Sequence, residues 1–218
     1  MKKYLITQLV ALVCICVNAQ EKSSLQTTKS FIGNCKYEII VGYNTTVVSS
    51  PFDEAKIGYN LGVTARKDIK TFNDDKIAIN GIVGLILTKR GGKVDNDAMS
   101  LGDETKNWSF SALSVPIHIG CEYRLKRVSF FTDLGPNLLF KTGGGEMENL
   151  SANAFGVGAG FNLGVRFKKF AISFGVDEDL TKMGTFTPDT DQQSYLHLDK
   201  DKYNLKTGEF HFDLRWTL

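Results

Sequence analysis

Apolar and polar residues alternate along most of the chain after Ser30, with the period of two that is typical of half-buried β-strands. Three segments show the pattern most clearly, from Ser111 to Leu125, from Phe155 to Phe167 and from Glu209 to Leu218. In each, every second residue is mostly large and apolar, while the residues between are small, polar or charged. Each segment therefore predicts a strand with one apolar and one polar face.

Five further segments repeat the pattern less regularly, within residues 37–44, 57–64, 77–87, 128–140 and 170–177. The exceptions are Ile82, Ile86, Phe131 and Leu139, apolar residues that fall on the polar face. The sequence thus predicts eight strands, and bacterial membrane barrels contain an even number of strands.

The predicted connections between these strands alternate in length. The second, fourth and sixth have about 8, 2 and 2 residues, with the second running from about Ile69 to Asp75. The others have about 7, 22, 13 and 22 residues, centred on Pro51, Asp95, Gly144 and Asp191, with Gly143-Gly144-Gly145 expected as a loop tip. Short turns on the periplasmic side and long loops outside are typical of outer-membrane barrels. We therefore expect an all-β fold, an eight-stranded antiparallel up-and-down transmembrane β-barrel with both termini periplasmic.

The size of the apolar side chains indicates which face points outward. The apolar face carries the large rings of Phe130, Phe140, Phe155, Phe161, Phe167, Phe170, Phe174, Phe210, Phe212 and Trp216. An eight-stranded barrel has an interior just wide enough for side chains to fill, so these rings do not fit inside. We expect them to contact lipid. A soluble secreted barrel that binds an apolar ligand, as lipocalins do, is the alternative.

The first residues have the features of a secretory signal peptide. Lys2 and Lys3 precede an apolar run from Leu5 to Val17, which is shorter than the roughly 20 residues of a spanning helix. Small residues follow, and we expect cleavage between Ala19 and Gln20. The predicted organisation is a signal peptide at 1–19, a short periplasmic N-terminal segment at 20–34 and the outer-membrane β-barrel domain at 35–218.

Charge and cysteine content argue against two other kinds of protein. The formal net charge of +2 falls to about zero without the two signal-peptide lysines, whereas nucleic-acid binding needs a clustered basic face. Cys35 and Cys121 would remain in the mature chain, which is too few for a disulfide framework. They fall on strands that we expect on opposite sides of the barrel, so no bridge between them is expected.

Charged residues and two histidines lie on the face that we expect to point into the barrel. They are Glu38, Arg66, His118, Glu122, Arg124, Asp133, Arg166, His211, Asp213 and Arg215. Buried charges need partners, so we expect a structural network that plugs the lumen. An ion-conducting path is the alternative, although eight strands leave too little bore for a porin. No metal-binding motif such as H-E-x-x-H accompanies the histidines, so no metal, cofactor or catalytic role is predicted for them.

Four short segments carry a family resemblance. Leu113-Ser114-Val115-Pro116-Ile117 is similar to a leucine-x-isoleucine-proline motif before an aliphatic run, and Gly135-Pro136 is similar to a glycine-proline strand. YNLGVTARKDI resembles a second strand, and GVGAGFNLGVRFKKFAISFGVDEDLTKM resembles a hairpin of the sixth and seventh strands. From about Cys35 to Leu218 the chain thus resembles the PorT-type outer-membrane β-barrel family. The resemblance implies an eight-stranded barrel typical of Bacteroidetes-like Gram-negative envelopes, and it fixes no activity.

The last predicted strand looks like the recognition strand that the barrel-assembly machinery reads. Its apolar face carries Phe210, Phe212, Leu214, Trp216 and Leu218. Leu218 stands where the family usually has an aromatic end residue, which predicts a weaker assembly signal.

Together these features favour a non-enzymatic outer-membrane barrel with a structural, interaction or export-accessory role. The expected partners are outer-membrane lipid and lipopolysaccharide, the barrel-assembly machinery and envelope proteins, but not nucleic acid. An alternative is an enzyme that acts on lipid A or peptides at the extracellular rim, with Ser194 and His197 as candidate residues. The loop acids Asp95, Asp97, Asp189, Asp191, Asp199 and Asp201 lack the spacing of a calcium loop, and solvated or lipopolysaccharide-facing charge is expected there.

Overall fold

The computed structural model describes residues 35–49, 54–93, 107–144, 146–147, 150–187 and 203–218. The chain divides into two units, Met1–Cys35 and Lys36–Leu218, and only the second is considered below. Several sequence predictions fall outside the described residues. They are the signal peptide with its cleavage site at Ala19 and Gln20, the segment 20–34, the pair Ser194 and His197, and the loop acids named above.

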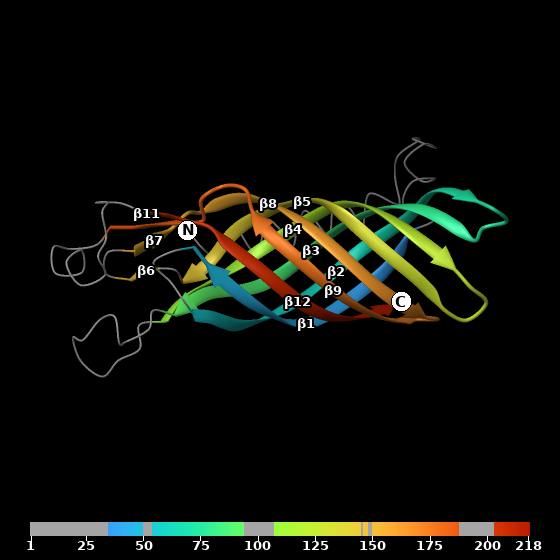
Figure 1. The fold of residues 1–218 in the computed structure, drawn as a ribbon, viewed down its shortest axis with the longest axis horizontal. Coiled ribbons are helices and arrows are strands. Elements are labelled where there is room, and N and C mark those ends of the chain that lie inside the picture. Colours follow the sequence, from blue (N-terminus) through green and yellow to red (C-terminus); the bar gives the residue numbers. More distant parts are fainter. Residues whose placement is uncertain (1–34, 50–53, 94–106, 145, 148–149, 188–202) are drawn as a thin grey trace, which may run out of the picture. The chain divides into compact units, whose positions relative to one another are not determined.

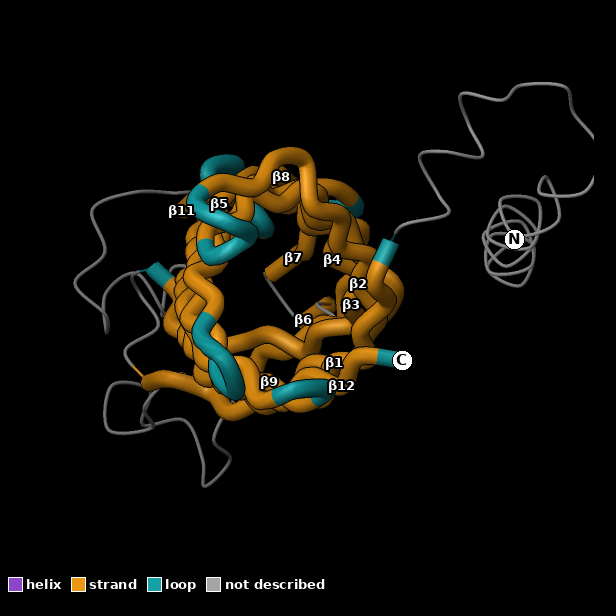
Figure 2. The backbone as a smooth tube through the Cα atoms, turned by 90° about the vertical axis from the view of Figure 1, so that its right-hand side faces the viewer, coloured by secondary structure: helices purple, strands orange, loops and turns teal. Residues whose placement is uncertain are grey.

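Eight strands form a closed antiparallel barrel, which appears as a complete ring when viewed from its end (Figure 2). They are β1 (Lys36–Val48), β2 (Glu54–Phe72), β3 (Ile77–Lys93), β4 (Asn107–Arg124), β5 (Ser129–Gly144), β8 (Phe155–Phe167), β9 (Phe170–Asp179) and β12 (Thr207–Thr217). Each pairs with the next barrel strand along the chain, and β1 pairs with β12 to close the ring, with Ile39 opposite Trp216. The predicted eight-stranded antiparallel up-and-down barrel is therefore confirmed.

A second sheet lies within two connections that the sequence predicted to be loops. It contains β6 (Glu146–Met147), β7 (Leu150–Ala152), β10 (Gly184–Phe186) and β11 (Tyr203–Leu205), in the order β11-β10-β7-β6. Figure 1 shows β6, β7 and β11 gathered beyond one end of the barrel. The prediction of plain loops was wrong because strands of two or three residues are too short to show a period of two.

The strands of the barrel also reach further than their sequence patterns indicated. β3 continues to Lys93 and β4 begins at Asn107, so much of the predicted third loop belongs to the barrel wall. β2 continues to Phe72, which leaves residues 73–76 as a tight turn. Gly143 and Gly144 end β5 and are not a loop tip, which corrects the prediction for these two glycines.

The two ends of the barrel differ, and we name them by their connections. The turn end has the connections 73–76, 125–128 and 168–169, whereas the loop end has the connections 49–53, 94–106, 145–154 and 180–206. β1 begins and β12 ends at the turn end, where the amide of Leu218 donates to the carbonyl of Tyr37 at 2.9 Å. Both ends of the barrel domain therefore lie at the turn end.

Burial along the strands is the reverse of that in a water-soluble protein. Apolar side chains face outward, and Ile57, Ile119 and Phe174 keep 75%, 64% and 57% of their surface exposed. The buried residues include many polar and charged ones, whereas such residues are mostly exposed in soluble proteins. This alternation matches a barrel that contacts lipid outside and encloses a polar lumen. Ile82, Phe131 and Leu139 point inward, as their places in the pattern predicted.

Among the described residues, no helix has the length and apolar character needed to cross a bilayer.

Candidate functional site

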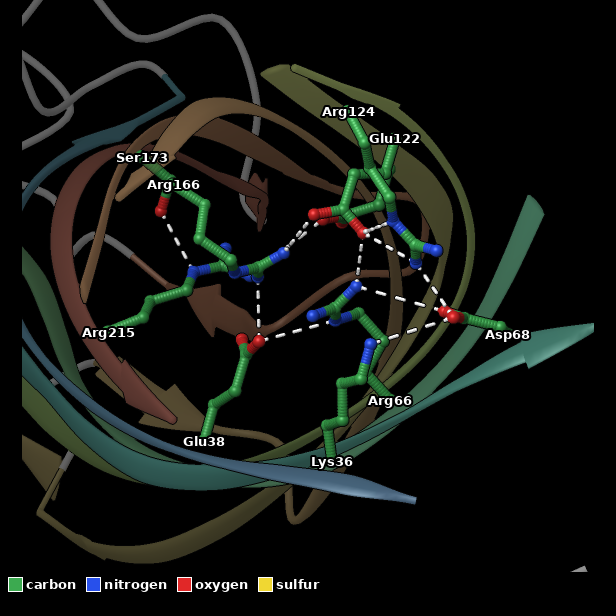
Figure 3. A network of polar contacts seen from close by, with 10 residues as sticks. Lys36, Glu38, Arg66, Asp68, Glu122, Arg124, Arg166, Ser173 and Arg215 are labelled. Atoms are coloured by element: carbon green, nitrogen blue, oxygen red, sulfur yellow. Dashed lines mark hydrogen bonds and ion pairs between the residues drawn. The ribbon is translucent and has the colours of Figure 1, made fainter. Parts of the chain in front are cut away.

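The inward charges nearest the short turns form a cluster that we call the turn-end cluster (Figure 3). It consists of Glu38, Arg66, Asp68, Glu122, Arg124 and Arg166. Glu122 accepts hydrogen bonds from Arg66 Nη1 at 2.5 Å and from Arg166 Nη1 at 2.9 Å. Glu38 Oε1 accepts from Arg166 Nη2 at 2.6 Å and from Arg66 Nε at 3.3 Å. Two carboxylates and two guanidinium groups thus form a closed ring of ion pairs.

This ring crosses the lumen because its residues come from four strands, β1, β2, β4 and β8. The two glutamates are each 2% exposed, and the two arginines are 5% and 6% exposed. Towards the rim, Arg124 links Glu122 to Asp68 with contacts of 3.1 and 2.7 Å, and Lys36 lies 3.6 Å from the same aspartate. Buried charges are tolerated when they are paired and hydrogen-bonded, and every charge of the ring has two partners or more.

Arg215 and the inward ring of Phe131 extend the cluster into the barrel. Arg215 Nε donates to Ser173 Oγ at 2.9 Å, and its Nη1 lies 3.8 Å from Asp133. The guanidinium carbons of Arg215 and Arg166 lie 5.3 and 4.9 Å from the centre of the Phe131 ring. The aromatic ring therefore offers its face to two cations, an arrangement that stabilises buried guanidinium groups.

The two predicted lumen histidines lie further along the barrel, each beside an aspartate. His118 Nδ1 lies 2.7 Å from Asp133 Oδ1, and its Nε2 lies 3.0 Å from Asn137 Oδ1. His211 Nδ1 lies 2.8 Å from Asp213 Oδ2. Both nitrogens of His118 are thus occupied by neighbouring side chains, which suits a structural role. Among the described residues, no group of three or more His, Cys, Asp or Glu side chains could hold a metal ion.

A second charged group, which we call the loop-end cluster, was not predicted from the sequence. It consists of Arg90, Asp177, Asp179, Thr207 and Glu209. The buried guanidinium of Arg90 contacts all three carboxylates, Glu209 at 2.7 Å, Asp179 at 3.0 Å and Asp177 at 3.4 Å. Thr207 supports this group because its amide donates to Asp179 at 3.0 Å and its hydroxyl also contacts that carboxylate.

The signal that could have identified Arg90 lies in the strand that carries it. Thr88 and Arg90 continue the inward positions of β3, although the sequence pattern predicted that they lie in the third loop. Thr88 is hydrogen-bonded to Glu209 at 3.3 Å, and Asn60 donates to the same glutamate at 3.1 Å. Asn44 joins them through Asn60 at 2.8 Å. If the alternation had been extended along β3 as far as residue 90, it would have predicted that Arg90 points into the barrel.

An apolar cluster lies beside these charges, and we call it the apolar plug. It consists of Val48, Phe110, Ala112, Leu139, Met183, Phe186 and Leu205, with Tyr203 packed against it. Strand residues of the barrel thus pack against residues of β10, β11 and the segment before β10. Gly156 makes room for this packing, since a Cβ at that position would overlap the sulfur of Met183.

The apolar face of β12 lies on the outside of the barrel. Phe210, Leu214, Trp216 and Leu218 are exposed, and Phe212 packs its ring 4.9 Å from that of Phe174. Trp216 contacts Phe170 edge-to-face at 4.2 Å. Cys121 also faces outward from β4, and it forms no disulfide with Cys35. The structure thus places the residues of the predicted assembly strand where another protein or lipid can reach them.

No protein-family model matches the chain. No curated protein sequence matches it either. Several solved structures are similar. The outer membrane enzyme PagL is 10% identical, with 80% of this chain and 97% of that chain covered and a TM-score of 0.47. Ail, the attachment invasion locus protein of Yersinia pestis, is 16% identical, with 85% and 99% covered and a TM-score of 0.41. Neisserial surface protein A is 9% identical, with 84% and 97% covered and a TM-score of 0.42. The fold of this chain rests on its own strand pairing, in which eight antiparallel strands close into a barrel.

Proposed function

We propose that this chain is a small integral barrel of a bacterial outer membrane, exported by a cleaved signal peptide and closed to ion flow. Its role is structural, or lies in interaction or export assembly at the loop end, and it is not an enzyme. The PorT-type resemblance of the sequence supports the same kind of protein.

The observation that carries this proposal is the combination of an apolar exterior with a lumen crossed at two levels. The ion-pair ring of Glu38, Arg66, Glu122 and Arg166 crosses it near the turn end. Near the loop end, inward residues of β1, β4 and β5 form the apolar plug with residues of β10 and β11. Because the interior of an eight-stranded barrel is just wide enough for side chains to fill, we infer that these two levels close the lumen.

The energetics of the ring argue against an opening during normal function. Moving one member aside would leave its partners buried and uncompensated, which costs about 3–5 kcal/mol. At the loop end, by contrast, the plug includes residues of the second sheet, which belongs to the long connections. Loops carry function more often than the scaffold that positions them, so we place the interaction surface at the loop end.

Two measurements on the full chain test the proposal. After expression in a Gram-negative host, the protein should fractionate with the sarkosyl-insoluble envelope and migrate faster on gels when it is not boiled. Folded protein added to a planar lipid bilayer should give no stepwise current. A soluble fraction with fixed migration would overturn the membrane assignment, and regular single-channel steps would overturn the closed lumen.

The interaction role needs a separate experiment with photo-crosslinking residues. We would place them at Lys182 and Lys206, which are exposed at the loop end, and at Lys126 and Lys169, which are exposed at the turn end. In native envelopes, discrete protein adducts are expected from the loop-end positions. Adducts that arise only from the turn end would contradict the placement of the interaction surface.

A further inference from the structure

The exposed charges described at the turn end are mostly basic. Basic residues are exposed at the turn end, namely Lys70, Lys76, Lys126, Arg127, Lys168 and Lys169. Asp74 and Asp75 are the exposed acids of the turn 73–76. In the sequence, three of the four loop-end connections hold mostly acids, whereas the connection 180–206 holds four aspartates and four lysines. Six exposed basic side chains against two exposed acids thus give the turn end a basic surface.

These basic side chains stand directly beside exposed aromatic rings. Phe167 and Phe170 flank the turn Lys168-Lys169 and are 49% and 55% exposed. The ammonium group of Lys70 lies 4.9 Å from the centre of the Phe72 ring. Aromatic residues of membrane barrels mark the two interfaces between hydrocarbon and headgroups. The basic groups next to them therefore lie at the level of the lipid phosphates.

The shortness of the turns keeps the charges at that level. Only Lys168 and Lys169 separate β8 from β9, and residues 125–128 separate β4 from β5. In turns this short, the charged group of a lysine or arginine lies no further from the barrel than the length of its own side chain. A partner in the aqueous phase would have to approach the membrane surface itself, whereas lipid headgroups already surround the barrel at this height.

The backbone of Lys168 supplies an independent observation. Its φ angle is +54°, in the left-handed region where glycine or asparagine is favoured. A two-residue hairpin turn with positive φ at its first position ordinarily carries glycine there. Strained positions cluster at functional sites, and Lys168 is the lysine with positive φ among the described residues.

We propose that the turn end binds anionic phospholipid headgroups through Lys126, Arg127, Lys168 and Lys169. This inference rests on the proposed function, because it needs the barrel in a membrane. The binding is electrostatic and shallow, and it fixes the height and orientation of the barrel in the leaflet that the turns face. Opposite charges at a membrane surface attract within a Debye length, so the interaction weakens with salt.

The test compares lipid selectivity of three forms of the full chain in phosphatidylcholine vesicles. Spin-labelled phosphatidylglycerol and spin-labelled phosphatidylcholine report the immobilised lipid by electron spin resonance. The wild-type protein should immobilise the anionic probe several-fold more strongly at low salt, and the preference should fall at high salt. The variant Lys126→Gln, Arg127→Gln, Lys168→Gln, Lys169→Gln should lose this preference. The matched loop-end variant Lys56→Gln, Lys141→Gln, Lys182→Gln, Lys206→Gln should keep it.

The outcomes separate this inference from the proposed function. Insertion is checked for each variant by faster migration of the unboiled protein, and failure of the wild-type protein to insert would overturn both proposals. If the wild-type protein inserts but shows no preference for the anionic probe, only the lipid site is overturned. The same holds if the turn-end and loop-end variants lose this preference equally. Co-sedimentation with purified peptidoglycan sacculi, without lipid preference, would assign the basic end to an anionic polymer and would also overturn it.

Discussion

The two ends of the lumen are closed by different chemistry. At the turn end, three arginines and three carboxylates meet in balanced pairs, and all six belong to barrel strands. At the loop end, one arginine faces three carboxylates, and apolar side chains of the second sheet complete the closure. The turn-end closure forms with the barrel itself, whereas the loop-end closure needs segments that return from long connections. The conformation of the loop-end closure can therefore change while the strand pairing of the barrel stays the same.

The largest difference between the two ends should come from Arg90→Gln. The variant removes the guanidinium that contacts the buried carboxylates of Asp179 and Glu209 and the partly buried carboxylate of Asp177. Breaking a buried ion pair costs about 3–5 kcal/mol, and three carboxylates around one lost cation place this variant near the upper value. Urea unfolding in lipid vesicles, followed by tryptophan fluorescence, measures the change in the free energy of unfolding.

The pH dependence of this variant has a definite sign. Lowering the pH protonates the buried carboxylates of Asp179 and Glu209 and removes their mutual repulsion in the variant. The same protonation removes favourable pairs with Arg90 in the wild-type protein. The difference in the free energy of unfolding between the wild-type protein and Arg90→Gln should therefore narrow as the pH falls. A gap that stays constant down to pH 4 would mean that the loop-end charges contribute little to stability.

A smaller loss is expected from Glu122→Gln at the turn end. The substitution removes one charge, but the amide oxygen still accepts hydrogen bonds from the arginines that Glu122 contacts, and Glu38 and Asp68 still face them. We expect a loss of about 3 kcal/mol. Acid should narrow this difference in stability too, because protonation of Glu122 in the wild-type protein removes the same charge that the substitution removes. If Glu122→Gln lost more stability than Arg90→Gln, the balanced turn-end cluster would not tolerate the loss of one charge better than the loop-end cluster does.

The alternating pattern of the sequence predicts most of the turn-end cluster, but it does not predict Arg90 at the loop end. Period two identified the inward face, and with it every member of the turn-end cluster except Asp68, which lies beside an irregularity in the pairing of β2 with β3. Arg90 was missed because the glycines and charges that follow it resemble a loop. The length of a strand beyond its regular apolar positions depends on pairing with its neighbours, and pairing is a tertiary property.

The second sheet could not be predicted for a related physical reason. Its strands take their partners from distant connections, as when Thr185 pairs with both Ser151 and Asn204. No local pattern specifies such a contact, and the apolar residues Met183, Phe186 and Leu205 look like isolated hydrophobic positions in a polar loop. Their role is evident only in the folded barrel, where they pack in one cluster with the inward side chains of Leu139 and Phe110.

A steric test addresses the loop-end packing alone. Gly156→Ala places a methyl group against Met183, and overpacking of this kind costs about 1–3 kcal/mol. The double variant Gly156→Ala, Met183→Ala should recover part of that loss, because the space is shared. Gly208→Ala is the matched control, since nothing lies within 4 Å of a Cβ there, and it should leave stability unchanged. Additive losses in the double variant would show that Met183 does not pack against β8 in the membrane.

The smallest effect, and one of opposite sign, is expected at the turn end from Lys168→Gly. Glycine adopts the positive φ of this position without strain, so the variant should be more stable by about 0.5 kcal/mol after the entropy cost of glycine is included. Lys169→Gly is the matched control: it removes the same charge at a position without positive φ, and it should lower stability instead. Both variants should weaken the preference for anionic lipid to a similar degree. At Lys168 stability would then rise while lipid selectivity falls, whereas at Lys169 both would fall. This difference separates the effect of backbone strain from the effect of the lysine charge.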